Sequence, residues 1–247
     1  MSSLAPRFVL PALLLLPLLA TACGDSAADR RMAISQWRSE PSEENVGKIR
    51  ESLADPDHDV RATALWAIVQ LGADDAEEQA LGALDDSHGF VRATAAKLLG
   101  DLESRAAAPA LAQKVAQDSD RWVRQRAAEA LSLIGGDEAV SGLRKALEDP
   151  DKDVRRAAAA GTVELDPVGA FDAFVFMIQN DAEWELRVRA AQGLGGSGLE
   201  AAEPILEQAT SDPNEYVRAA AANALRLLRG ETIPSTPVAG GHLPGAR

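Results

Sequence analysis

The apolar and polar positions between residues 43 and 230 follow a helical period in six similar units. The second helical segment of the first unit is representative. Its apolar residues Val60, Ala64, Ala67, Ile68 and Leu71 recur at spacings of three and four, as on one face of an α-helix. No stretch alternates apolar and polar residues over enough positions to predict a strand. The sequence therefore predicts an all-α domain over residues 31–230, with two helices in each unit.

Each unit carries the same short signature. An apolar residue followed by arginine recurs at steps of 31 or 32 residues, an aspartate stands five positions earlier, and an alanine stands four positions after the apolar residue. A repeat of this length indicates a solenoid, in which each unit packs on its neighbours. The aspartates are Asp55, Asp86, Asp118, Asp149, Asp181 and Asp212, the arginines are Arg61, Arg92, Arg124, Arg155, Arg187 and Arg218, and the alanines are Ala64, Ala95, Ala127, Ala158, Ala190 and Ala221.

The helix boundaries follow from capping residues. Asp57, Asp120, Asp151 and Asn214 stand three positions before the signature in four units, and these residue types favour the N-cap of a helix. The second helix of each unit should therefore begin there. The first helices are expected near Val46–Ala54, Glu77–Leu84, Pro109–Gln117, Ala139–Glu148, Gly169–Gln179 and Ala201–Thr210, and Asp29–Glu40 should form a capping helix over the first unit.

The repeated residues have a structural reason. Alanine lets helices of adjacent units approach to about 8–10 Å. An aspartate in the turn accepts hydrogen bonds from backbone amides, and an arginine can bridge to the aspartate of the next unit, so the two series predict an ion-pair ladder along one edge. The alternative is an arginine track that binds phosphate or carboxylate groups.

The signature also resembles a known family. Asp55-Pro56, Asp149-Pro150 and Asp212-Pro213, each followed by the Val-Arg pair and its alanine, are similar to HEAT repeats, in particular to the short HEAT-like repeats of phycobilisome lyases. The resemblance covers residues 43–230. It implies a right-handed α–α superhelix of six helix pairs plus an N-terminal capping helix.

The two ends lie outside this pattern. Residues 1–22 contain Arg7 and an apolar run from Phe8 to Ala20, and Cys23 follows. This arrangement resembles a bacterial lipoprotein signal peptide with Cys23 as the lipidated residue, although Ala20 stands where that family prefers leucine. The alternative is ordinary secretion with cleavage after Ala22. We expect a lipid anchor in the bacterial cell envelope facing the periplasm or the cell exterior, a linker at residues 23–30, and a disordered tail at residues 231–247.

Net charge and cysteine content limit the classes of binding partner and the covalent links that we expect. The formal net charge is −13, which disfavours nucleic acid and anionic lipid headgroups. We therefore expect no nucleic-acid partner and membrane contact through the lipid anchor alone. Cys23 is the only cysteine, so an intramolecular disulfide is excluded.

The histidines predict no metal and no cofactor. HEAT-repeat deoxyhypusine hydroxylases, to which this kind of repeat is similar, bind a di-iron centre through His-Glu pairs. His58, His88 and His242 are followed here by aspartate, glycine and leucine. A divalent-ion site at His58 and His88 with nearby aspartates is the alternative. No nucleophile–histidine–acid set is evident, so the chain is predicted not to be an enzyme.

Alignment of the units singles out residues for partner contact. Trp66 stands where four other units have polar residues, and Phe176 and Met177 stand where most units are polar or charged. Exposed aromatic side chains can anchor a partner, although packing against the turns between units is the alternative. Four further aromatic residues stand at the starts of the second helices, namely Phe90, Trp122, Trp184 and Tyr216.

These observations predict a non-catalytic protein–protein interaction scaffold that binds another envelope protein or peptide along its concave face. The first alternative is a lyase-like enzyme or enzyme subunit of the HEAT-like repeat family. A spacer without a specific partner is the second.

Overall fold

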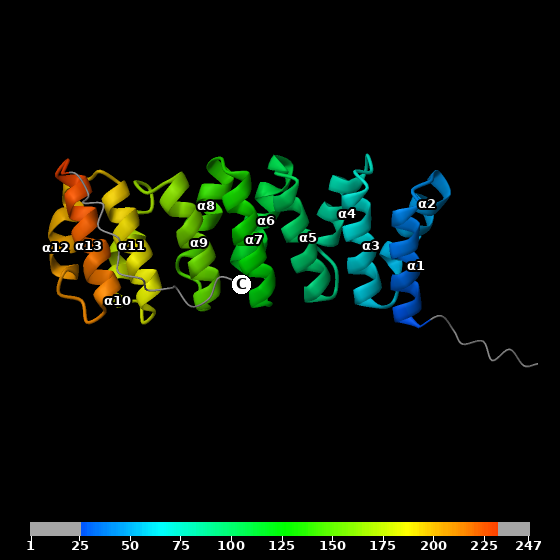
Figure 1. Ribbon diagram of the computed structural model, residues 1–247, viewed down its shortest axis with the longest axis horizontal. Helices are drawn as coiled ribbons and strands as arrows, with labels where there is room; N and C mark the ends of the chain where they lie inside the picture. The colour runs from blue at the N-terminus through cyan, green and yellow to red at the C-terminus, as the bar shows by residue number, and fades with distance from the viewer. Residues whose placement is uncertain (1–25, 232–247) are drawn as a thin grey trace, which may run out of the picture.

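The computed structural model describes residues 26–231, and within this range the chain is helical without strands. The prediction of an all-α solenoid is confirmed. Figure 1 shows the helices side by side along one long axis, with α1 and α2 at one end and α12 and α13 at the other. No described helix combines the length and the apolar character that are needed to cross a bilayer. Cys23, the predicted signal peptide and the residues after 231 lie outside the described range.

Each repeat is a pair of helices, preceded by α1 (Ala27–Ser39) at the N-terminal end. The first helices of the six repeats are α2 (Glu43–Glu51), α4 (Ala76–Ala83), α6 (Ala108–Gln117), α8 (Asp137–Ala146), α10 (Phe171–Asn180) and α12 (Glu203–Ala209). The second helices are α3 (His58–Gln70), α5 (Gly89–Asp101), α7 (Arg121–Ile134), α9 (Lys152–Leu165), α11 (Trp184–Gly196) and α13 (Glu215–Leu228). Short 3-10 turns occupy Ser52–Ala54, Arg105–Ala107 and Glu200–Ala202.

The second helices begin where their capping residues stand. The Asp57 carboxylate accepts hydrogen bonds from the backbone N–H groups of Asp59 and Val60 at the start of α3. Helix α2 begins three residues earlier than expected, because the Ser42 side chain caps it by accepting from the N–H of Asn45. A serine at that position satisfies an amide that has no partner within the helix.

The second helices form the more tightly packed layer. Neighbours α3 and α5, α5 and α7, α7 and α9, α9 and α11, and α11 and α13 all pack directly, and Figure 1 shows them as one continuous row. Among the first helices, only α6 and α8 pack comparably closely. A curved stack brings its inner layer closest together, so the second helices line the concave side. The signature alanines lie between them and are completely buried.

A continuous apolar spine runs through the stack. Leu65, Leu99, Leu131 and Leu194 are fully buried members of one cluster that reaches from the second helix of the first repeat to Leu225 in α13. A second cluster under α1 contains Ile34 and Ile49, among others. Helix α1 packs on α2 and α3, so it covers the apolar end of the first repeat.

Candidate functional site

Five of the six ladder arginines each donate two hydrogen bonds to the carboxylate of the aspartate in the next repeat. In the typical case, Arg124 Nε and Nη2 donate to the two carboxylate oxygens of Asp149 at 2.7 and 3.1 Å. Its Nη1 donates to the carbonyl of Asp118 at 3.0 Å, and Asp149 also accepts from the N–H of Asp151 at 2.8 Å. Two-pronged contacts of this kind fix both side chains. The other four pairs are Arg61–Asp86, Arg92–Asp118, Arg155–Asp181 and Arg187–Asp212.

The two ends of the ladder differ. Asp55 receives Arg30 of α1 instead of an arginine from a preceding repeat, with Nε–Oδ2 and Nη2–Oδ1 distances of 2.7 and 2.9 Å. Arg218 donates to the carbonyls of Asp212 and Pro213 at 2.8 and 3.0 Å, but no carboxylate within residues 26–231 accepts from it. The five paired guanidinium groups are thus engaged in contacts between repeats and present no arginine track for anions.

The ladder changes the acidity of its members. The hydrogen bonds from Arg61 lower the pKa of Asp86 more than burial raises it. Burial is the largest influence on Asp118 and would raise its pKa, but the hydrogen bonds from Arg92 and a backbone N–H, together with the charges of Arg92 and Lys114, outweigh it, so the pKa lies below its ordinary value. The carboxylates in turn raise the pKa of Arg61 and Arg92. Both partners therefore stay charged near neutral pH.

Aromatic rings mark the N-terminal ends of the second helices. Phe90 of α5 and Trp122 of α7 are 52% and 50% exposed. Tyr216 of α13 stacks on Trp184 of α11, with ring centroids 5.0 Å apart. The fourth repeat has Asp153 at the position of Trp122 and so contributes no ring to this series.

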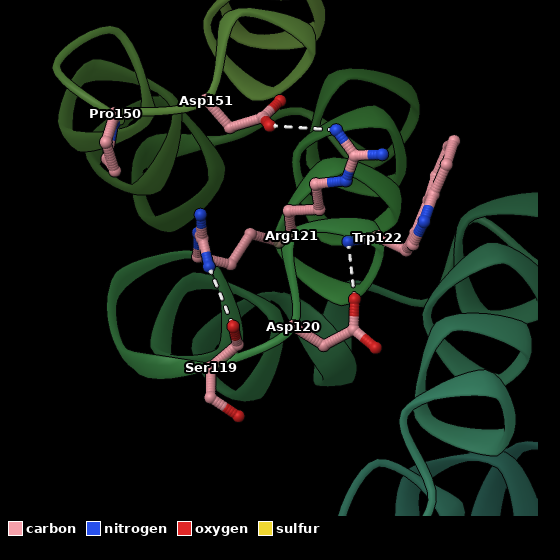
Figure 2. Close-up of a pocket in the computed structure, with 7 residues that line it drawn as sticks. Ser119, Asp120, Arg121, Trp122, Pro150 and Asp151 are labelled. Atoms are coloured by element: carbon pink, nitrogen blue, oxygen red, sulfur yellow. Dashed lines mark hydrogen bonds and ion pairs between the residues drawn. The ribbon is translucent and has the colours of Figure 1, made fainter.

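The ring of Trp122 lies at the edge of a shallow hollow of about 670 Å³ between α7 and the start of the next second helix. Figure 2 shows the Arg121 side chain extending toward Asp151, while the backbone N–H of Trp122 donates to the Asp120 carboxylate at 2.8 Å. The Arg121 guanidinium carbon is 4.9 Å from the Trp122 ring centroid, and its Nη1 is 3.4 Å from Asp151 Oδ2. A cation over the ring face orients the indole.

The same indole borders a second hollow, of about 690 Å³, between α7 and α9. Leu133, which is 61% exposed, supplies apolar surface there, and Glu129 and Arg156 supply both signs of charge. Arg156 forms an ion pair with Asp153. We call this second hollow, between α7 and α9, the Trp122 hollow. It combines an aromatic wall, an aliphatic contact and paired charges on the concave face, which suits a ligand with apolar and polar parts.

Sequence reasoning did not single out Leu133. The signal was present, because the equivalent positions of three other repeats hold the polar residues Gln70, Asp101 and Glu164. An apolar residue at an otherwise polar, solvent-facing position is the same signal that selected Trp66.

The remaining predicted contact residues lie in two other places. Trp66 is 40% exposed on α3, with the guanidinium carbon of Arg38 4.6 Å from its ring centroid. Phe176 and Met177 are neighbours on α10, but Phe176 is 66% exposed whereas Met177 is 2% exposed. Met177 therefore belongs to the core, and only Phe176 offers a ring to solvent. The structure brings neither of these places together with Trp122.

The two described histidines stack on each other. The ring centroids of His58 and His88 are 3.6 Å apart, and His58 Nε2 is 3.6 Å from Asp59 Oδ1. His88 Nδ1 caps α5 by accepting from the N–H of Phe90. Within residues 26–231 no three histidine, cysteine, aspartate or glutamate side chains gather as metal ligands. The described residues therefore do not fit the di-iron centre that the hydroxylase resemblance implies.

Comparison with known proteins identifies the repeats. The chain matches the family of HEAT repeats over residues 47–113, 79–164 and 172–236. The HEAT-like repeats protein of the archaeon Thermococcus onnurineus has the same fold, with a TM-score of 0.55 at 16% sequence identity over 82% of this chain and 93% of the archaeal chain.

Two curated relatives are enzymes. Deoxyhypusine hydroxylase of Mus musculus is 31% identical over 119 residues, which are 47% of this chain and 39% of the relative. The enzyme of Homo sapiens is 29% identical over 138 residues, which are 54% of this chain and 45% of the relative. The chain thus spans about two fifths of the length of these relatives.

These relatives overturn two predictions made from the sequence. A non-catalytic scaffold and the statement that the chain is not an enzyme were both wrong, because the relatives of known function are hydroxylases. The predictions relied on the absence of His-Glu pairs at the three histidines. The similarity to the hydroxylases instead extends over about half of the chain.

Proposed function

Because this chain belongs to the HEAT-repeat family, we propose that it acts as an enzyme of that family, in the form of a hydroxylase subunit related to the deoxyhypusine hydroxylases. The observation that carries the proposal is the identity of about 30% with those enzymes over about half of the chain. The relatives are more than twice as long as the matched region, so the activity of the whole relative is part of the proposal.

The described residues suit substrate binding better than metal binding. They gather no set of three metal ligands, so we assign to them the holding and orienting of the substrate, and to another part of the enzyme the reacting centre. The Trp122 hollow is the best placed surface for this task, since Trp122 lines two hollows between the third and fourth repeats. The Arg121 guanidinium lies against the ring, and the Asp120 cap fixes the backbone that carries it, so the indole loses little freedom when it covers a ligand.

We also propose that the subunit is held in the bacterial cell envelope through lipid on Cys23. The support is the signal-peptide pattern of residues 1–22 and the position of the single cysteine directly after it. Lipid chains at this position would anchor the solenoid stably without a transmembrane helix.

A hydroxylation assay tests the proposal. The native complex is purified by a tag on this chain and incubated with iron(II), air-saturated buffer and a peptide that carries deoxyhypusine, and mass spectrometry measures the gain of one oxygen atom. The purified chain alone and the mouse hydroxylase run in parallel. We expect oxygen incorporation by the native complex, and a loss of about tenfold in kcat/KM for Trp122→Ala.

Phe90→Ala is the matched control, because Phe90 occupies the corresponding position of the preceding repeat with almost the same exposure. It should leave the rate within about twofold of the wild type. The hydroxylase assignment is refuted when the mouse enzyme modifies the peptide but neither the native complex nor the chain alone does so.

A further inference from the structure

A second surface, separate from the Trp122 hollow, lies on the outer layer between α8 and α10. Helices α6 and α8 pack together because Gly142 has no side chain, and a Cβ there would stand only 3.0 Å from Ala112 Cβ. Helices α8 and α10 make no such close contact. A groove of about 670 Å³ lies between the turn that follows α8, at Leu147–Asp149, and helix α10. We call it the α8–α10 groove.

The inner part of this groove is apolar. Leu147 and Met177 are 4% and 2% exposed and line it together with Ala173. Phe176 stands at its side with 66% of its surface in contact with solvent. A phenyl ring next to buried aliphatic side chains offers an anchor for an apolar side chain of a partner, because covering the ring removes apolar surface from water.

The rim of the groove is acidic. Asp149 and Asp181 are neutralised by the ladder arginines Arg124 and Arg155. Glu148 and Asp172 are exposed, and no described cation forms an ion pair with either of them. 

The basic residues of α8 do not cancel this charge. Arg144 is directed to Asp166 and to the carbonyl of Gly169, and neither it nor Lys145 lines the groove. Two carboxylates without a described ion pair therefore line the groove, Glu148 in the turn after α8 and Asp172 in the first turn of α10.

We propose that the α8–α10 groove binds a peptide segment of another protein in which an apolar side chain is flanked by lysine or arginine. The apolar side chain lies against Phe176 above Leu147 and Met177, and the cations lie near Glu148 and Asp172. The net charge of −13 adds long-range attraction for such a segment. This inference does not depend on the proposed hydroxylase function, because it rests on a different face and on binding alone.

The charge pattern decides between two occupants. Residues 232–247 of this chain contain apolar residues but no lysine and a single arginine, Arg247, so they match the two carboxylates poorly. A separate lysine-rich segment matches both the apolar floor and the acidic rim.

Fluorescence polarisation with labelled, amidated peptides tests the inference on the full chain. The probe carries one leucine between lysines; one control peptide has glycine in place of leucine, and another has glutamate in place of lysine. We expect the probe to bind with an affinity that falls as salt rises, and each control peptide to bind at least about tenfold more weakly. Equal binding of the probe and both control peptides overturns the proposal.

Two variants locate the binding. Phe176→Ser should weaken binding of the probe by about tenfold or more, since it removes the apolar anchor without changing the charge; the ring is mostly exposed, so the circular dichroism spectrum should be unchanged. Glu148→Lys with Asp172→Lys should weaken binding by about tenfold. The matched control, Glu51→Lys with Glu78→Lys, changes the net charge equally on exposed residues of α2 and α4, and should keep binding within about threefold.

The proposal is overturned if both variant proteins bind the probe as the wild type does, or if the control pair weakens binding as much as the groove pair. It is also overturned in favour of the chain's own tail if removing residues 232–247 raises the affinity for the probe at least about tenfold. An unchanged affinity after that deletion supports a partner in trans.

Discussion

The ion-pair ladder predicts that a signature arginine contributes strongly to the free energy of unfolding only where the next repeat supplies an aspartate for it. Arg124 and Arg218 stand at equivalent positions of their repeats. Arg124 grips Asp149 of the next repeat, whereas Arg218 has only carbonyl acceptors among residues 26–231. Replacing each by alanine therefore separates the ladder contact from the residue's contribution to its own turn.

The expected magnitudes follow from burial. The side chains of Arg124 and Asp149 are 15% and 6% exposed. Without the guanidinium, the Asp149 carboxylate keeps one backbone donor, the N–H of Asp151, in a place that water barely reaches. Breaking a buried pair by removing one partner costs about 3–5 kcal/mol. Because Asp149 keeps one donor, Arg124→Ala should lower the free energy of unfolding by about 3 kcal/mol. Arg218→Ala removes only exposed hydrogen bonds to carbonyls, so it should cost less than about 1 kcal/mol.

Thermal unfolding followed by far-UV circular dichroism measures the difference. For a domain of this size, Arg124→Ala should lower the Tm by about 6–12 °C and Arg218→Ala by less than about 4 °C. Arg124→Lys should recover little of the loss, because an ammonium group cannot make the two-pronged contact. Equal losses for Arg124→Ala and Arg218→Ala would show that the arginine stabilises its own turn and that the contact between repeats contributes little.

Three further predictions concern acid, packing and anchoring. The pKa of Asp118 and of three other ladder aspartates is lowered in the folded state, so their contribution is present above about pH 4 and is lost as the pH falls further; the Tm should be level from neutral pH to about pH 5 and fall below about pH 4, and a level Tm at lower pH would contradict this. Gly195→Ala should cost about 1–3 kcal/mol because its Cβ would stand 2.9 Å from the Cα of Ala224, whereas Gly47→Ala, with open space in α2, should stabilise by about 0.5–1 kcal/mol; urea unfolding compares the two. Cys23→Ser should move the protein from the membrane fraction to the soluble fraction of fractionated cells, and retention in the membrane would contradict lipid anchoring.

The repeat pattern made the architecture predictable, because each signature residue has one structural task in every unit. The alanines are small where second helices approach each other, and all six are fully buried. The aspartates at Asp57, Asp120 and Asp151 begin their helices by capping them. Such tasks depend on neighbours within about one repeat length, so the sequence alone specifies them.

The surfaces were harder to predict, because they depend on how far neighbouring helices separate. Phe176 and Met177 both differ from the polar residues of other repeats, yet one is exposed and the other is buried. A difference of one position on a helix turns a side chain by about 100°, so Met177 packs into the core while Phe176, beside the same groove, stays exposed. The α8–α10 groove also depends on the absence of close packing between two particular helices, which no single repeat encodes.

The same distinction explains why the enzyme relationship was missed. Helical packing positions recur in every HEAT repeat and dominate the similarity between solenoids, whereas ligands of a reacting centre occupy a few positions in a few repeats. A subunit that binds substrate and leaves the reacting centre to another part of the enzyme keeps the first kind of residue and has no need of the second. His58 and His88 show the first kind of task, because their rings stack and His88 caps α5. In such a subunit we expect functional residues among the exposed apolar side chains that depart from the polar residues of most other repeats, as Leu133 does on α7 and Phe176 on α10.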